Sequence, residues 1–257
     1  SLSAGEYTRA LKHFRNAVRL GPADRDLLRK IGVCLIRTGQ ERRALPFLWK
    51  AAEGTGASTA AIEQLALGLY RMANVRLAGR QALRAIERGR TDARLIAIAA
   101  DGKRRASGAH RGRYAKQLFS LQGGGDVCAL ARASLLIAEG DFLRAERVLA
   151  GIKEDSDYRR LTGIYRARLA WRRGERDRAI SLLKGIEREF PNLWGAGLIL
   201  VRVLFSDGRD ESALERAREL QAKFGSENSF QLGLALVFEE YGRSARVLEL
   251  ALGLAEE

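Results

Sequence analysis

The sequence predicts an all-α protein built as a solenoid of paired helices. The first observation is a fixed period, because Gly140, Gly174 and Gly208 follow one another at equal intervals. The second is that an alanine stands five residues after each of these glycines. The third is that the 257 residues include only 3 Pro, so few positions would interrupt a helix. A period of about 34 residues is typical of stacked helical repeats.

The period continues in both directions along the chain. The marks outside the central stretch are Gly5 with Ala10, Gly39 with Ala44, Ala73 with Ala78, and Gly242 with Val247. The interval from Ala73 to Gly140 departs from the period, since it falls one position short of two units. We therefore expect one irregular unit near residues 91–125.

The unit from Arg25 to Ser58 shows the pattern most completely. It carries Leu28, Ile31, Gly32 and Leu35 in its first helix and Ala44, Leu48 and Ala51 in its second. With these residues the chain resembles the tetratricopeptide repeat (TPR) family. The resemblance covers the whole chain and implies a right-handed α-solenoid of about seven and a half helix-turn-helix units, the first of them truncated. Arg132 and Arg166 depart from the family pattern, because a packed Leu is usual at their positions.

Each unit is expected to hold two amphipathic helices that bury their apolar faces against neighbouring units. The alanines after the turns are small enough to let paired helices approach closely, and the turn glycines can adopt positive φ and end each first helix. The expected helices span residues 7–20, 25–37, 42–53, 59–72, 76–88, 91–106, 110–121, 127–139, 142–153, 158–173, 177–190, 193–205, 211–224, 230–241 and 244–255.

Composition bears on location and on the two cysteines. No stretch approaches the roughly 20 apolar residues that a membrane helix needs, and no signal peptide is visible. The chain begins without Met and in mid-repeat, so we expect it to be part of a longer protein. Cys34 and Cys128 lie about three repeats apart, which predicts two buried, reduced thiols. Reduced thiols favour a cytoplasmic location, with a membrane-anchored or periplasmic parent chain as the alternative.

Charge divides the sequence into two parts. Residues 1–125 hold 24 Lys and Arg against 9 Asp and Glu, whereas residues 126–257 hold 21 against 22. The change coincides with the glycine run 123–125, which is typical of a flexible or sharply turned joint. We therefore expect a basic array over 1–125 and a near-neutral array over 126–257. The alternative is a distorted repeat with an ordinary loop at the glycine run.

No constellation in the sequence predicts catalysis, a metal site or a cofactor. The two histidines, His13 and His110, lie about three repeats apart, and neither has a Cys or carboxylate at ligand spacing. No phosphate-binding loop, nucleophile elbow or zinc-protease motif is present. Gly54-Thr55-Gly56 is interpreted as a loop, because no strand precedes it and a third glycine is missing. We therefore expect a non-catalytic protein.

The resemblance implies that first helices line the concave surface and bind partners. Their inward residues, which we call the first-helix face, are the second, fifth, ninth, twelfth and thirteenth of each unit. In this sequence that rule selects Arg29, Arg37, Tyr70, Arg71, Arg104, Arg168, Trp171, Arg172, Arg202 and Phe205. Arg suits an anionic partner because its planar fork binds a carboxylate through two hydrogen bonds. The alternative is a solvated face whose aromatic residues pack between helices.

Three functions remain open at this point. The first is a scaffold that binds an acidic peptide or helix of another protein on the first-helix face. The second is RNA or DNA binding by the basic half, through Arg84, Arg88, Arg104, Arg105, Arg111 and Arg113. The third is a structural part of a secretion or membrane-associated assembly. Chaperone binding through a carboxylate clamp is disfavoured, because the Lys and Asn pair of that subtype is absent at the fifth and ninth positions.

Overall fold

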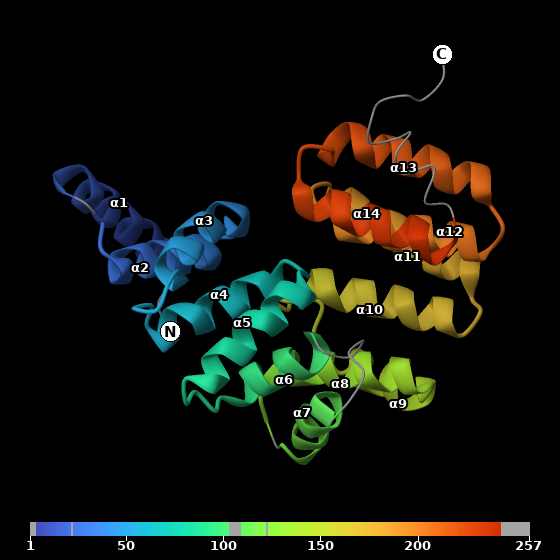
Figure 1. Ribbon diagram of the computed structural model, residues 1–257, viewed down its shortest axis with the longest axis horizontal. Helices are drawn as coiled ribbons and strands as arrows, with labels where there is room; N and C mark the ends of the chain where they lie inside the picture. The colour runs from blue at the N-terminus through green and yellow to red at the C-terminus, as the bar shows by residue number, and fades with distance from the viewer. Residues whose placement is uncertain (1–3, 22, 103–108, 122, 243–257) are drawn as a thin grey trace. The chain divides into compact units, whose positions relative to one another are not determined.

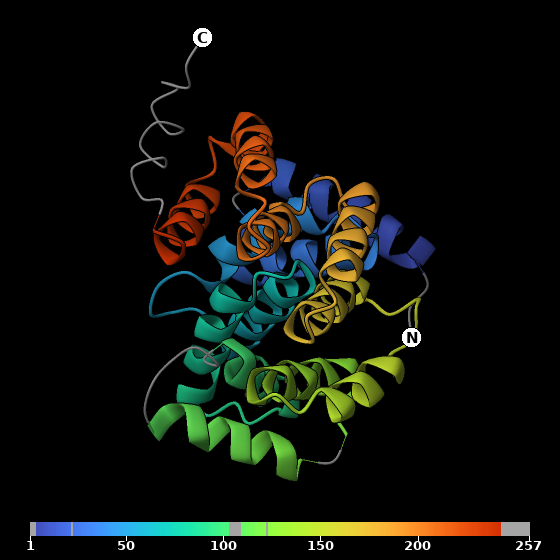
Figure 2. The ribbon, with the colours of Figure 1, turned by 90° about the vertical axis from the view of Figure 1, so that its right-hand side faces the viewer.

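The computed structural model describes residues 4–21, 23–102, 109–121 and 123–242, and in these ranges the chain is all α-helical, as predicted. Paired helices such as α2 with α3 and α4 with α5 lie side by side and are joined by short turns (Figures 1 and 2). The helices in the described ranges are α1 (Ala4–Leu20), α2 (Arg25–Arg37), α3 (Glu41–Ala52), α4 (Thr59–Arg71), α5 (Val75–Glu87), α6 (Ala93–Gly102), α7 (Ala109–Ser120), α8 (Gly125–Glu139), α9 (Phe142–Ala150), α10 (Arg159–Arg172), α11 (Arg176–Glu189), α12 (Trp194–Ser206), α13 (Asp210–Phe224) and α14 (Asn228–Glu240).

The sequence period is visible directly in the backbone of the turns. The glycines that separate paired helices have positive φ, at 73° for Gly39, 86° for Gly140, 84° for Gly174 and 73° for Gly208. Ala73 occupies the equivalent turn between α4 and α5 with φ of 59°, so an L-residue adopts the left-handed conformation there. At these five described turns the first helix of a repeat therefore ends in the same way, with or without glycine.

The alanines that follow these turns pack where they were expected to pack. Ala44, Ala78, Ala145, Ala179 and Ala213 are all completely buried. A methyl side chain at each position lets the second helix lie close against the first, and a larger side chain would have to displace its neighbours. The prediction of close helix pairing is confirmed at these five sites.

The irregular unit and the ends of the chain differ in detail from the expectation. Among the described side chains of α7, Leu118 is fully buried and Phe119 is 40% exposed, so the helix packs through Leu118. Gly5 lies in the first turn of α1 rather than between two helices. The expected helix over residues 244–255 falls outside the described residues.

Arg132 explains one departure from the repeat pattern. It lies on α8, and its guanidinium donates to the carbonyl oxygens of Leu118 and Leu121 at the C-terminal end of α7. The last carbonyl groups of a helix have no intrahelical donor, so a neighbouring cation can satisfy them. A Leu at this position would pack against α7 but could not cap it.

The chain forms two compact units, which we call unit 1 (Ser1–Leu161) and unit 2 (Thr162–Glu257). Helix α10 begins in unit 1 and continues into unit 2. The boundary predicted at 125/126 from charge and the glycine run lies inside unit 1, and it stays a prediction. Along the described ranges, none of the helices combines the length and apolar character that crossing a bilayer requires.

Candidate partner-binding surfaces

The first-helix face of unit 2 begins on α10, with three of the predicted residues. The indole Nε1 of Trp171 donates to Ser206 Oγ on α12 at 2.9 Å, which ties the two first helices together. The Arg168 guanidinium lies 5.7 Å from the centre of the Tyr165 ring on the same helix. Arg172 follows one turn later and is exposed. Trp171 is thus partly structural, while Arg172 is open to solvent.

On α12 the predicted residues join that helix to α14. The Arg202 guanidinium forms an ion pair with Glu240 at 2.7 Å. The Phe205 ring stacks on Tyr241 with centroids 5.4 Å apart and meets Phe238 edge-on. Phe205 is buried by these contacts. Arg202 and Phe205 therefore stabilise the packing of neighbouring units, and a role for them in binding a partner stays a prediction.

Two leucines on α14 were missed by the sequence analysis. Leu232 is 59% exposed and Leu236 is 37% exposed. They are the fifth and ninth residues of the unit that begins at Asn228, so they occupy the same positions as Leu198 and Arg202 one period earlier. The position rule extended by one period selects both leucines, whereas the predicted first-helix face contained only arginine and aromatic residues.

In unit 1 the predicted residues are mostly engaged within the chain. Arg29 pairs with Asp26 on its own helix at 2.6 Å. The Tyr70 hydroxyl is buried and donates to Asp101 at 2.8 Å. Arg71 pairs with Asp157 at 2.6 Å. Arg37 is exposed. The predicted residue Arg104 lies outside the described residues.

A buried network of hydrogen-bonded polar side chains joins three successive first helices of unit 1. Asp101 on α6 is fully buried and accepts hydrogen bonds from Tyr70 on α4 and from Ser134 on α8, the latter at 2.6 Å. Glu63 on α4 is almost as deeply buried and accepts from Arg90 and Arg94 at 2.9 and 3.1 Å. Buried carboxylates need such partners because desolvation is otherwise costly. These groups consequently stabilise the stack.

The segment 157–160 lies against α3 and α4 in the same unit. Asp157 reaches Arg71, the Tyr158 ring lies 6.0 Å from the Tyr70 ring, and Arg160 pairs with Glu41 at 3.5 Å. Burial raises the pKa of the Tyr158 hydroxyl, so the phenol stays neutral over the physiological range. Part of the predicted binding face of unit 1 is therefore covered by the chain's own acidic and aromatic side chains.

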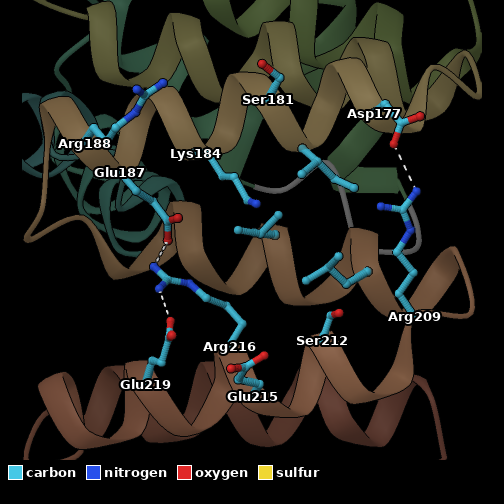
Figure 3. Close-up of a pocket in the computed structure, with 13 residues that line it drawn as sticks. Asp177, Ser181, Lys184, Glu187, Arg188, Arg209, Ser212, Glu215, Arg216 and Glu219 are labelled. Atoms are coloured by element: carbon cyan, nitrogen blue, oxygen red, sulfur yellow. Dashed lines mark hydrogen bonds and ion pairs between the residues drawn. The ribbon is translucent and has the colours of Figure 1, made fainter.

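Unit 2 also contains a cleft of about 850 Å³ between the second helices α11 and α13 (Figure 3). Apolar side chains from α11 and α12 contribute to its lining through Ile180, Leu200 and Leu204. Figure 3 shows Lys184 reaching into the cleft, whereas Arg188 points away from it. The repeat pattern points to first helices as the binding face, so it gave no sign of this cleft between second helices.

Acidic and basic side chains alternate around the cleft. Arg209 pairs with Asp177 at 3.0 Å, and Arg216 bridges Glu187 and Glu219 (Figure 3). Because the charges are largely paired, the cleft shows no strong preference for an anion or a cation. In the described ranges, no three His, Cys, Asp or Glu side chains gather closely enough to hold a metal ion.

The basic residues proposed for nucleic acid have other partners where the structure describes them. The Arg84 guanidinium donates to the carbonyl oxygens of Ala52 and Gly54, both at 2.7 Å. Arg88 donates to Ala57 at 2.7 Å and to Thr55 at 3.3 Å. These two residues fix the loop between α3 and α4. Arg113 is exposed; Arg104, Arg105 and the side chain of Arg111 lie outside the described residues.

Comparison with known proteins adds information about the fold. No known family model matches the sequence, and no curated protein matches it. Among solved structures, a human IFIT1 dimer with PPP-AAAA is similar over 99% of this chain and 78% of that chain, with 14% identity and a TM-score of 0.54.

Two further solved structures are less similar. A tetratricopeptide repeat protein from Parabacteroides merdae has 15% identity over 91% of this chain and 93% of its own, with a TM-score of 0.49. The TPR domain of P58(IPK) has 15% identity over 98% and 80%, with a TM-score of 0.35. The similarity to the IFIT1 structure, at 14% identity, bears on the fold alone.

Proposed function

We propose that this chain, which has a TPR-like helical repeat fold, is a non-catalytic scaffold that binds an acidic segment of another protein on the first-helix face of unit 2. The observation that supports this proposal is the state of two guanidinium groups on α10. Within the described part of the chain, Arg168 and Arg172 have no carboxylate partner, whereas Arg29, Arg71 and Arg202 each have one.

The spacing of Arg168 and Arg172 favours an anionic ligand. They are four residues apart on one helix, where like charges destabilise the helix by about 0.2–0.5 kcal/mol. A carboxylate bound between them would remove that repulsion and accept charge-assisted hydrogen bonds from both forks. Trp171, whose indole is held by Ser206, supplies a rigid aromatic surface between the two arginines in sequence.

The test is a calorimetric titration of the full chain with a Glu-rich helical peptide. We expect binding that the double variant Arg168→Glu, Arg172→Glu weakens at least tenfold, since a hydrogen bond to a charged group contributes about 1.5–3 kcal/mol. The matched control is Arg147→Glu with Arg218→Glu, which makes the same change of charge at two exposed positions on second helices. Equal affinity of the two double variants would contradict the proposal.

A further inference from the structure

The contact between segment 157–160 and α4 does not follow the register of the repeat. Hydrogen bonds between side chains of neighbouring units join residues about one period apart, such as Tyr70 with Asp101 at a separation of 31 and Trp171 with Ser206 at 35. Arg71 and Asp157, by contrast, lie between two and three periods apart in the sequence. Stacking of adjacent units therefore does not account for this pair, which resembles a peptide bound on the first-helix face.

The side chains that meet there have the chemistry of a recognition site. The Asp157 carboxylate lies 2.6 Å from Arg71 Nη2, while the Tyr158 ring packs against Tyr70 and lies 6.0 Å from the Arg71 guanidinium carbon. Asp157 is itself about half exposed, whereas the Arg71 side chain is only 11% exposed. A mostly buried guanidinium thus holds a carboxylate that reaches it from the surface.

Asp157 uses only part of the hydrogen-bonding capacity of Arg71. The Nε atom of Arg71 is buried and has no hydrogen-bond partner among the described residues. A guanidinium can bind one carboxylate through two parallel hydrogen bonds, and a buried donor without an acceptor costs about 1–3 kcal/mol. A carboxylate that satisfied Nε as well as Nη2 would therefore bind Arg71 better than Asp157 does.

We propose that the first-helix face of α4 is a binding site for a short peptide motif of an acidic residue followed by an aromatic one. Asp157 and Tyr158 of the same chain occupy this site, and a partner protein carrying the motif binds by displacing them. The connection that holds the occupant is short and lies between α9 and α10, where Lys153, Glu154 and Asp155 are exposed. This site goes beyond the proposed function, because it lies in unit 1 and uses none of the α10 residues.

The experiment supplies the motif in trans to the full chain. The variant Asp157→Lys, Tyr158→Ala removes the internal occupant, and the probe is a synthetic peptide with the sequence of residues 152–160. We expect the peptide to bind this variant at least tenfold more tightly than the unchanged chain, because a site that is mostly occupied lowers apparent affinity by its free fraction. A peptide with alanine at both motif positions is the control and should not bind.

Two further measurements keep the proposal falsifiable. Adding Arg71→Ala to the double variant should abolish peptide binding if the carboxylate is recognised there. If the double variant does not fold, hydrogen exchange of residues 154–160 is measured in the unchanged chain, where excess peptide should increase it. A folded variant that does not bind the peptide, or exchange that the peptide leaves unchanged, would show that Asp157 and Tyr158 only brace unit 1. Either result overturns this site and leaves the α10 proposal standing.

Discussion

At the scale of single residues, several arginine side chains in this protein donate hydrogen bonds to backbone carbonyl oxygens. Arg84 and Arg88 hold the carbonyl groups of the loop after α3, and Arg132 caps α7. Carbonyl groups that are buried or lie in turns need hydrogen-bond donors. A guanidinium offers five N–H donors in a fixed planar arrangement. Counting positive charges in the sequence therefore overestimates how many arginines are available for a partner.

Among the described residues, Ala73 is the one non-glycine residue whose backbone adopts a positive φ. Its φ of 59° is the conformation that glycine adopts in the equivalent turns, and this conformation costs an L-residue about 1–2 kcal/mol. We expect Ala73→Gly to raise the melting temperature by about 2–4 °C per kcal/mol recovered. Gly39→Ala is the reciprocal control. Its added Cβ would meet no atom within 4 Å, so only the energetic cost of a positive φ in an alanine should lower the melting temperature. Calorimetry that found no opposite shifts would contradict this account.

The two cysteines give a prediction about reactivity. Both thiols are free and buried, and burial raises the pKa of each above its usual value. The thiolate is the reactive form, so a thiol reagent at neutral pH should modify neither residue until the protein unfolds. The neutral thiols favour the folded state at neutral pH, and that contribution is lost as pH rises through their raised pKa. Rapid labelling of native protein, followed by mass spectrometry, would show this to be wrong.

At the scale of helices, close approach depends on small residues at fixed points. Besides the alanines after the turns, Gly79 on α5 and Gly102 on α6 meet backbone to backbone. A Cβ added at Gly79 would lie 2.7 Å from the Gly102 Cα, and one added at Gly102 would lie 2.6 Å from the Gly79 Cα. Since no flexible side chain can move aside there, the two helices themselves would have to separate.

Two substitutions of glycine by alanine separate packing from helix propensity. Gly79→Ala should lower the free energy of unfolding by about 1–3 kcal/mol, because it overpacks the contact between α5 and α6. Gly185→Ala on α11 should leave stability unchanged or raise it by up to about 1 kcal/mol, because the added Cβ meets nothing within 4 Å. Chemical denaturation measures both. Equal effects of the two variants on the free energy of unfolding would mean that the contact between α5 and α6 tolerates a side chain at position 79.

At the scale of the whole molecule, charge and function need separate tests. The excess of Lys and Arg over residues 1–125 will attract polyanions, but Arg84 and Arg88 direct their donors to the protein itself. We expect the chain to bind RNA and DNA weakly and to lose that binding steeply as salt rises. Filter binding at two salt concentrations checks this. Tight binding that persists at high salt would instead favour a nucleic-acid function.

Arg84→Lys with Arg88→Lys is the matched variant for that experiment. It keeps both charges but removes the planar forks that hold the loop carbonyls. We expect lower thermal stability and unchanged affinity for nucleic acid, because salt-dependent binding follows charge rather than hydrogen-bond geometry. A large loss of RNA affinity with unchanged stability would place these two arginines at a binding surface.

The repeat period by itself determined the all-α class, the pairing of helices and most helix bounds. Gly140 and Ala145 illustrate the reason. Gly140 provides a left-handed turn and Ala145 a buried methyl group, and residues with these properties recur at the same positions along the repeat. The expected pair 25–37 and 42–53 corresponds to α2 and α3 within one residue at each end. Such local constraints can be predicted from the sequence, because each involves residues that are close together along the chain.

Only the tertiary structure decided which of the predicted side chains remain open to a partner. Arg71 and Arg172 obey the same position rule, yet Arg71 is covered by Asp157 from more than two periods away, and Arg172 is exposed. The cleft between α11 and α13 and the exposed leucines of α14 likewise depend on which helices meet. A repeat pattern specifies contacts one period apart, so a contact that skips units has no signature in it and arises only when the whole chain has packed.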